Sequence, residues 1–283
     1  MIKLVVSDID GTLVDQTEAL REPAFEAVRL LRGRGVLFSL ATGRVQGMAE
    51  AYAQALGVTV PYVTTNGAAL IHQGRALKRW RMPLGPLERI IREADARGLS
   101  VIYSPDGYER VLRETPFILA QQKAFRRYFD VQPLSPADYA HGEIEKLCLM
   151  DDDRTGAIEE IERLARQLPE AYGYTRYGLR AVEIVRSGRS KASGIRDLAR
   201  CMHIPMSDVM VVGDDENDLE MLAAAGVGAT VCNALPKVKE QADYVAEASH
   251  AAGVLEAVRR FLPPEQTKED RNLAAFHLDL HLL

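Results

Sequence analysis

Two aspartates near the beginning of the chain have the spacing to perform chemistry together. Asp8 and Asp10 come directly after the short apolar run 4–6. If the chain stays extended there, their side chains leave on the same side. Two carboxylates about 4 Å apart repel each other by roughly 4 kcal/mol at an effective dielectric constant of 20. The pair therefore needs a cation, and Mg²⁺ suits an all-oxygen site because it keeps waters and shares oxygens with a phosphate.

More carboxylates follow a second apolar run far along the chain. Asp214, Asp215 and Asp218 come after one such run, and Thr42 comes after another. Helix capping is a competing explanation for Thr42 alone, and attraction to a helix dipole is one for the acidic cluster. In a parallel α/β sheet, however, ligands gather at the carboxyl ends of the strands. Several strands that end in polar residues therefore predict one shared site.

Strands and helices alternate near both ends of the chain, which predicts how these residues are positioned. The apolar runs are short enough only for buried strands, and glycines follow several of the expected helices. The pattern predicts a Rossmann-like α/β core with a parallel sheet. Strands are expected at 4–6, 36–41, 62–65, 209–212, 227–231 and 244–245, and helices at 22–32, 45–56, 191–202, 217–225 and 254–261.

The middle of the chain has a different pattern, in which helices are mixed with hairpin-like strands. Such a mixture indicates an α+β domain with antiparallel strands. Helices are expected at 87–97, 116–128 and 154–168, and strands at 100–103, 108–112, 144–150 and on either side of Tyr177-Gly178. We therefore expect a core of residues 1–82 and 185–262, an inserted cap at 83–184 and a tail at 263–283. The tail could be an edge strand, a packed arm or a disordered segment.

Length, composition and charge exclude several classes of protein. The 283 residues suffice for a core domain with an insertion. The formal net charge is −5, and lysines and arginines are scattered along the chain, so we expect no nucleic-acid partner. The first residues turn acidic at Asp8, too early for a secretory signal. No apolar run approaches the roughly 20 residues that cross a bilayer.

The cysteines and histidines carry no sign of a metal or redox centre. Cys148, Cys201 and Cys232 are far apart and odd in number, without a CxxC pair. We expect them to be reduced thiols of a cytoplasmic protein. The six histidines show no spacing typical of metal ligands, and we interpret them as ordinary surface or core residues.

The polar clusters resemble the four motifs of the haloacid dehalogenase superfamily, in the same order. DIDGTL at 8–13 is similar to the first motif, ATGR at 41–44 to the second, Ser190-Lys191 to the third and GDDEND at 213–218 to the fourth. Asn66-Gly67-Ala68 and Asn233-Ala234 stand where the Cof-like phosphatases of this superfamily carry NGA and GNA. The resemblance covers residues 1–81 and 185–261, and the insertion resembles a class IIB cap.

The resemblance implies a role for each aspartate of the first motif. Asp8 would be the nucleophile that forms an aspartyl-phosphate, which splits one difficult step into two. Asp10 would protonate the leaving oxygen and then activate water. Mg²⁺ would be held by the Asp8 carboxylate, the Asp10 backbone carbonyl and Asp214, and would offset the repulsion between nucleophile and phosphate.

The other motifs would complete a phosphate site. Lys191 would place a positive charge on the phosphoryl oxygens, although for this residue taken alone a solvated lysine at a helix start would be the preferred explanation. Thr42, Asn217 and backbone amides near Gly43 would be phosphate ligands. Asp218 would orient Lys191, and Asp215 would hold a metal-bound water. Asn233 would lie near the phosphate. Two positions depart from the family pattern. Ala192 follows Lys191 where glycine is common, and Cys232 replaces a glycine before Asn233.

The implied activity is Mg²⁺-dependent hydrolysis of a small phosphomonoester, a sugar phosphate or similar metabolite. A phosphosugar mutase is an alternative, since phosphomannomutases share the cap class and the nucleophile. A non-catalytic metabolite-binding protein is a third possibility, which the full set of motif residues disfavours. The residues nominated for contact with the substrate are Tyr108, Arg176, Tyr177 and Glu183 in the cap and Arg44 and Asn66 beside the motifs, and each could instead have a purely structural role. The sequence specifies neither the substrate nor the oligomeric state.

Overall fold

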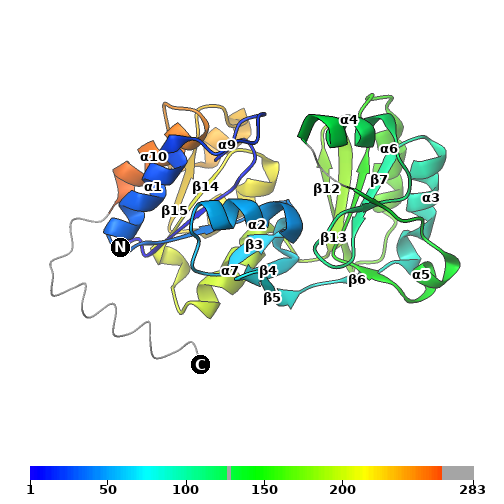
Figure 1. Cartoon of the computed structure of the whole chain (residues 1–283), viewed down its shortest axis with the longest axis horizontal. Helices are drawn as coiled ribbons and strands as arrows, with labels where there is room; N and C mark the ends of the chain where they lie inside the picture. The colour runs from blue at the N-terminus through cyan, green and yellow to red at the C-terminus, as the bar shows by residue number, and fades with distance from the viewer. Residues whose placement is uncertain (126–128, 263–283) are drawn as a thin grey trace. The chain divides into compact units, whose positions relative to one another are not determined.

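The computed structural model describes residues 1–125 and 129–262, which divide into two compact units (Figure 1). Unit 1 contains residues 1–42, 50–63 and the described residues from 191 onward, and unit 2 contains residues 43–49 and 64–190. The predicted tail at 263–283 and the end of the helix expected at 116–128 lie outside the described residues. The inserted cap at 83–184 stays a prediction, because unit 2 groups further residues with it.

Unit 1 is built on a five-stranded parallel sheet in the order β16-β15-β14-β1-β2. All residues of β1 and β14 are buried, as expected for strands covered on both faces. Their register places Ser7 beside Val212, so the residues that follow the two strands emerge next to each other. The strands are β1 (Leu4–Ser7), β2 (Leu37–Leu40), β14 (Val209–Gly213), β15 (Val227–Thr230) and β16 (Tyr244–Val245), and β3 (Tyr62–Thr64) is joined to the end of β2 by a bridge between Ala41 and Val63.

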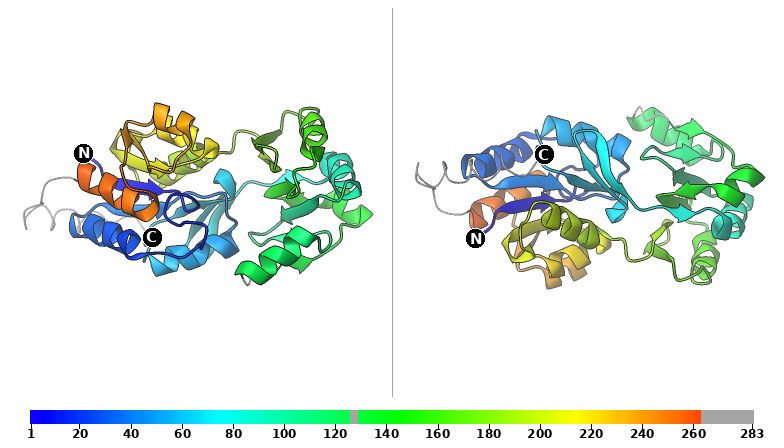
Figure 2. Two further views of the ribbon diagram at one scale, coloured as in Figure 1. Left: turned by 90° about the horizontal axis from the view of Figure 1, so that it is seen from above. Right: turned by 90° about the horizontal axis from the view of Figure 1, so that it is seen from below.

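Helices cover both faces of this sheet. α1 (Glu22–Gly33) packs against α10 (His250–Phe261) on one face, and α7 (Lys191–Cys201) packs against α8 (Leu219–Ala224) on the other (Figure 2). The buried residues of α1, which include Ala24, Ala27, Val28 and Leu31, recur at helical spacing. The other helical elements are α9 (Pro236–Gln241), the short 3-10 helices η3 (Met206–Asp208) and η4 (Glu216–Asp218), and α2 (Gln46–Ala55), of which residues 50–55 belong to unit 1.

Unit 2 contains a six-stranded sheet in the order β12-β13-β11-β7-β8-β9, antiparallel except between β8 and β9. Side chains alternate between its faces. Leu147 and Leu149 join the main apolar core, which also includes residues of α3 and α6, whereas Cys148 packs against a smaller cluster on the opposite face. The strands are β7 (Ser100–Ser104), β8 (Arg110–Val111), β9 (Asp130–Val131), β11 (Lys146–Met150), β12 (Tyr172–Tyr177) and β13 (Ala181–Arg186).

Helices and two smaller strand pairs complete unit 2. The helices are α3 (Glu88–Ala96), α4 (Pro116–Phe125), α5 (Pro136–His141) and α6 (Ala157–Ala165), with the 3-10 helices η1 (Thr65–Gly67) and η2 (Gly85–Leu87). The strand pairs are β4 (Ala69–His72) with β5 (Arg75–Arg79), and β6 (Met82–Pro83) with β10 (Glu143–Ile144). No helix among the described residues is both long enough and apolar enough to cross a bilayer.

The predicted fold class, a parallel α/β core with an α+β insertion, is confirmed, but some element limits were wrong. The strand expected at 144–150 is two strands, which are separated by Glu145, a buried carboxylate in an ion pair with Arg79. The helix expected at 217–225 begins as η4 and becomes α-helical at Leu219. The hairpin of β4 and β5 was not predicted, since the sequence of β5 shows no apolar alternation and its side chains are largely exposed.

Candidate active site

Three of the predicted acidic residues of unit 1, Asp8, Asp214 and Asp218, lie close together at the carboxyl ends of β1 and β14. Asp8 follows β1 and is only 3% exposed, and its backbone N–H donates to the Val212 carbonyl at 2.9 Å. Asp214 follows β14. Oxygens of Asp8, Asp214 and Asp218 lie within 4.8 Å of one another. The parallel register of the two strands thus places carboxylates that are far apart in sequence in one small volume.

A buried lysine lies among these carboxylates. Lys191, the first residue of α7, is 2% exposed, and its Nζ donates to Asp8 Oδ1 at 2.7 Å and to Asp218 Oδ1 at 2.7 Å. Burial alone would lower the pKa of Lys191, but the charges of Asp218 and Asp8 raise it above its usual range. The ammonium therefore stays charged, and one of its two ion pairs holds a side-chain oxygen of Asp8.

Asp218 has the geometry of a positioning residue. Its Oδ1 accepts from Lys191, and its Oδ2 accepts from the backbone N–H groups of Asp214 at 2.9 Å and Asp215 at 3.1 Å. Gly213 makes this turn possible, since a Cβ on it would lie 2.4 Å from the Asp218 carboxyl carbon. Both oxygens of Asp218 are used in holding Lys191 and the β14–η4 turn.

When ionised, Asp8, Asp214 and Asp218 together carry more negative charge than the single ammonium of Lys191 neutralises. Burial raises the pKa of Asp8 well above its usual range, although Lys191 opposes the shift. Burial also raises the pKa of Asp214 to about 6, although the hydrogen bond from Thr12 lowers it. Carboxylate oxygens are hard ligands that suit a divalent cation such as Mg²⁺. Because Asp218 is occupied by Lys191, Asp8 and Asp214 are the side chains that could hold the metal.

Gly11 allows the loop after β1 to approach Asp214. Its φ is +79°, in the left-handed region that favours glycine, and a Cβ there would lie 2.2 Å from Asp214 Oδ2. The next residue, Thr12, donates its hydroxyl to Asp214 Oδ1 at 2.5 Å. The glycine lets the loop come close to Oδ2 of Asp214 and the hydroxyl binds Oδ1, so the Asp214 carboxylate is held against the loop that carries Asp10.

Two side chains from the far end of the chain hold the same loop. Asn233 Nδ2 donates to the Gly11 carbonyl at 2.8 Å, and His250 Nδ1 lies 2.9 Å from that oxygen. A carbonyl can only accept, so Nδ1 of His250 carries the proton in this arrangement. Asn233 Oδ1 also accepts from the His250 backbone N–H at 3.0 Å. His250 was expected to be an ordinary surface or core residue, since a contact with a backbone oxygen leaves no motif in the sequence.

The other predicted site residues differ in burial and in their backbone contacts. Thr42 is buried at the end of β2, and its N–H donates to the Val63 carbonyl at 3.0 Å. Asp10 is exposed, and Asn217 is half-buried in η4. Asp215 caps η4 by accepting from the Glu216 N–H at 2.6 Å, which agrees with the helix start considered as the alternative for this acidic cluster, and its role at a metal-bound water stays a prediction. Gly43 belongs to unit 2.

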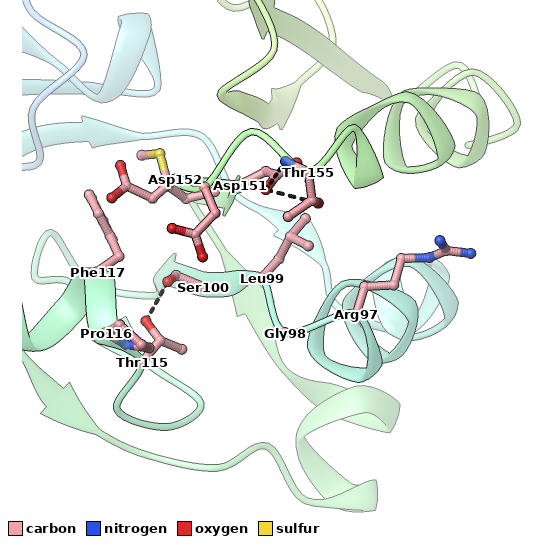
Figure 3. A pocket seen from close by; sticks show the side chains of 12 residues that line it. Arg97, Gly98, Leu99, Ser100, Thr115, Pro116, Phe117, Asp151, Asp152 and Thr155 are labelled. Carbon is pink, nitrogen blue, oxygen red and sulfur yellow. Dashed lines mark hydrogen bonds between the residues drawn. The ribbon is translucent and has the colours of Figure 1, made fainter.

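A separate cavity of about 170 Å³ lies within unit 2 (Figure 3). Four of its polar residues are paired with one another. The hydroxyls of Ser100 and Thr115 are 2.5 Å apart, and Asp151 accepts from the Thr155 backbone N–H and hydroxyl. None of the predicted site residues lines it, so we assign no chemistry to this cavity.

Comparison with known proteins identifies the family. The model of the haloacid dehalogenase-like hydrolases matches residues 5–258. The chain belongs to this family. Its membership confirms the resemblance drawn from the four motifs and the predicted hydrolase class.

Individual relatives of this hydrolase match over nearly their whole length. A phosphoglycolate phosphatase from Methanothermobacter thermautotrophicus is 29% identical over 92% of this chain and 99% of its own. An HMP-PP phosphatase from Escherichia coli is 26% identical over 93% and 95%. The solved structure of a sugar phosphatase of haloacid dehalogenase subclass IIB has a TM-score of 0.76 and 22% identity, over 92% of this chain and 98% of that one. This last likeness shows that the fold is shared.

Mg²⁺ should stabilise the folded hydrolase through Asp214. A ligand that binds only the folded state contributes about 2.7 kcal/mol at a hundred times its Kd, which corresponds to a rise of several degrees in Tm. Thermal unfolding with EDTA and with MgCl₂ measures the shift. Asp214→Asn should abolish it, and Glu220→Gln on the exposed side of α8 should leave it unchanged. An equal shift in wild type and Asp214→Asn would remove Asp214 from the metal site.

Gly11→Ala should disable the metal site, whereas Gly98→Ala should not. Both glycines have a positive φ, so both substitutions strain the backbone, at a cost of roughly 1–3 kcal/mol. Only the new Cβ at Gly11 meets Asp214, because nothing lies within 4 Å of the corresponding position at Gly98. The free energy of unfolding should fall in both variants, and only Gly11→Ala should lose the Mg²⁺-dependent Tm shift. A normal shift in Gly11→Ala would contradict this role of the loop.

Proposed function

We propose that this chain is a Mg²⁺-dependent phosphatase that hydrolyses small phosphomonoesters through an aspartyl-phosphate on Asp8. The observation that carries the proposal is the buried Asp8–Lys191–Asp218 ion-paired set beside Asp214. A carboxylate that attacks a phosphate dianion meets like-charge repulsion, so the site must concentrate positive charge. Lys191 supplies a permanent charge 2.7 Å from the attacking group. The names of the relatives, all phosphatases, support the same reaction.

Each residue has one task in the first step. An Asp8 oxygen attacks phosphorus, and the bond between phosphorus and the ester oxygen breaks as the new bond forms. Asp10, on the exposed loop two residues later, gives its proton to the leaving oxygen. Lys191 stabilises the negative phosphoryl oxygens. Asp218 keeps Lys191 in place through the ion pair at 2.7 Å.

The second step returns Asp8 to its starting state. Asp10, now ionised, takes a proton from water as the water oxygen attacks phosphorus, and the bond to Asp8 breaks to release inorganic phosphate. Thr42, Asn217 and the backbone N–H of Gly43 would hold the phosphoryl oxygens. Mg²⁺, held by the Asp8 and Asp214 carboxylates and the Asp10 carbonyl, would neutralise charge that develops on the phosphoryl group.

The substrate is proposed only as a class. The two relatives described above are named for different substrates at similar identity, so identity does not choose between them. A sugar phosphate or similar metabolite remains the proposed substrate, with residues 83–184 as the cap that closes over it. The described cysteines are free thiols, which supports action in the reducing cytoplasm.

Asp8→Asn should abolish turnover while leaving the fold intact. The amide has nearly the same shape but is not a nucleophile, so the Mg²⁺-dependent hydrolysis of p-nitrophenyl phosphate should fall by at least roughly 10³-fold, or about 4 kcal/mol of barrier. Asp153→Asn, an exposed aspartate of unit 2, is the matched control and should keep wild-type turnover. Phosphate release from p-nitrophenyl phosphate and a panel of phosphorylated metabolites measures both.

Three results would count against parts of the proposal. A wild-type protein without Mg²⁺-dependent phosphate release on any of these substrates would contradict the phosphatase. Wild-type turnover in Asp8→Asn would contradict the nucleophile. Transfer of phosphate between positions of a sugar, dependent on a bisphosphate activator, would favour the mutase instead.

A further inference from the structure

Unit 2 contains a buried lysine that the reaction described above does not use. Lys146, at the start of β11, is 6% exposed. It lies on the face of the sheet opposite to Leu147, which packs into the main core with α3 and α6. A buried ammonium is tolerated only where charges and hydrogen bonds compensate for lost hydration. The partners of Lys146 therefore indicate what this position does.

The shortest contact of Lys146 is to a backbone oxygen of the second motif. Its Nζ donates to the Gly43 carbonyl at 2.9 Å and lies 3.4 Å from Glu183 Oε2 and 3.9 Å from Glu109 Oε1. Burial lowers the pKa of Lys146, but Glu183 and Glu109 outweigh this effect and raise it above the usual range. The ammonium is thus permanently charged and directed at Gly43.

Glu183 links this lysine to a second contact on the same glycine. It lies on β13 opposite Cys148 of β11, and its Oε1 accepts from Asn66 Nδ2. The Asn66 amide packs against Gly43, because a Cβ on Gly43 would lie 3.2 Å from Asn66 Nδ2. Asn66 adopts a left-handed conformation, with φ 49° and ψ 44°, which asparagine tolerates better than most residues.

The segment after Gly43 is fixed as well. The N–H of Thr65 donates to the Arg44 carbonyl at 2.8 Å. The carbonyl of Gly43 is therefore held by Lys146, the Asn66 amide fills the space beside Gly43, and the Arg44 carbonyl is held by Thr65. These contacts restrict the two soft dihedrals of a glycine that would otherwise be the most mobile residue type in the chain.

We propose that Lys146, with Glu183 and Asn66, forms a brace that positions the Thr42–Gly43 peptide for phosphoryl binding. Gly43 directly follows Thr42 in the chain, so the backbone N–H of Gly43 is part of the Thr42–Gly43 peptide. Contacts that fix Gly43 therefore also fix this N–H, the proposed donor to the phosphoryl group. The inference rests on the proposed phosphatase function. It makes Lys146 a positioning residue, and it gives Asn66 and Glu183, nominated above as substrate contacts, an internal role.

Lys146→Met tests the brace, because methionine fills a similar volume without the ammonium. The phosphoryl group is common to all substrates, so kcat/KM should fall 10- to 100-fold for p-nitrophenyl phosphate and for the best phosphorylated metabolite alike. The inhibition constant of inorganic phosphate should rise in parallel. Lys123→Met on α4, an exposed lysine of the same unit, should change neither value. Lys146→Arg, which keeps a charged donor, should restore a large part of the activity.

A double variant separates the brace from simple destabilisation. Lys146→Met leaves Glu183 without its counter-ion, whereas Lys146→Met with Glu183→Gln removes both charges and keeps an oxygen acceptor for Asn66. If the brace acts as proposed, the double variant regains wild-type Tm but still binds inorganic phosphate weakly.

The outcomes distinguish this inference from the function on which it rests. An active wild type with unchanged phosphate inhibition in Lys146→Met and in the double variant would overturn the brace and leave the phosphatase intact. A loss confined to metabolites, with p-nitrophenyl phosphate unaffected, would also overturn it and make Lys146 a substrate contact. An inactive wild type would instead contradict the proposed function itself.

Discussion

The contact between the Lys191 ammonium and two carboxylates is the interaction on which the site depends. Asp8 and Asp218 each lie 2.7 Å from Nζ, all three side chains are buried, and Asp214 stands beside them. A buried charge without a partner is very costly, so these groups stabilise one another only as a set. Three carboxylates surround one ammonium, so the ionised set has an excess of negative charge that attracts a cation. The chemistry of the site follows from this imbalance.

The surrounding backbone is shaped to keep the set together. Gly213 lets Asp218 approach the end of β14, and Gly11 lets the first loop approach Asp214. Thr12, Asn233 and His250 then fix the oxygens of that loop and its aspartate partner. Each contact is modest by itself. Together they limit the movement of charged groups that must be aligned to within a fraction of an ångström for catalysis.

The fold was predictable from sequence where burial leaves a pattern. β1 and β14 are apolar because both of their faces are covered, and their polar ends mark the site because parallel strands share one edge. The hairpin of β4 and β5 was not predicted, because β5 is largely exposed and its sequence shows no apolar alternation. The contacts of His250 and Lys146 were not predicted for another reason. Each contacts a backbone oxygen far away in sequence, and one sequence does not reveal which carbonyl a side chain will reach.

The order of strands in unit 1 also governs when the site can exist during synthesis. β1 lies between β2 and β14, and Leu4 pairs with Val209. At the roughly 5–20 residues per second of translation, one side of β1 stays open for about 10–40 s. During this time Asp8 has neither Lys191 nor Asp214 near it, and an unpaired apolar strand is prone to wrong associations. The nascent chain therefore depends on protection of its first strand until the second half of the sheet emerges.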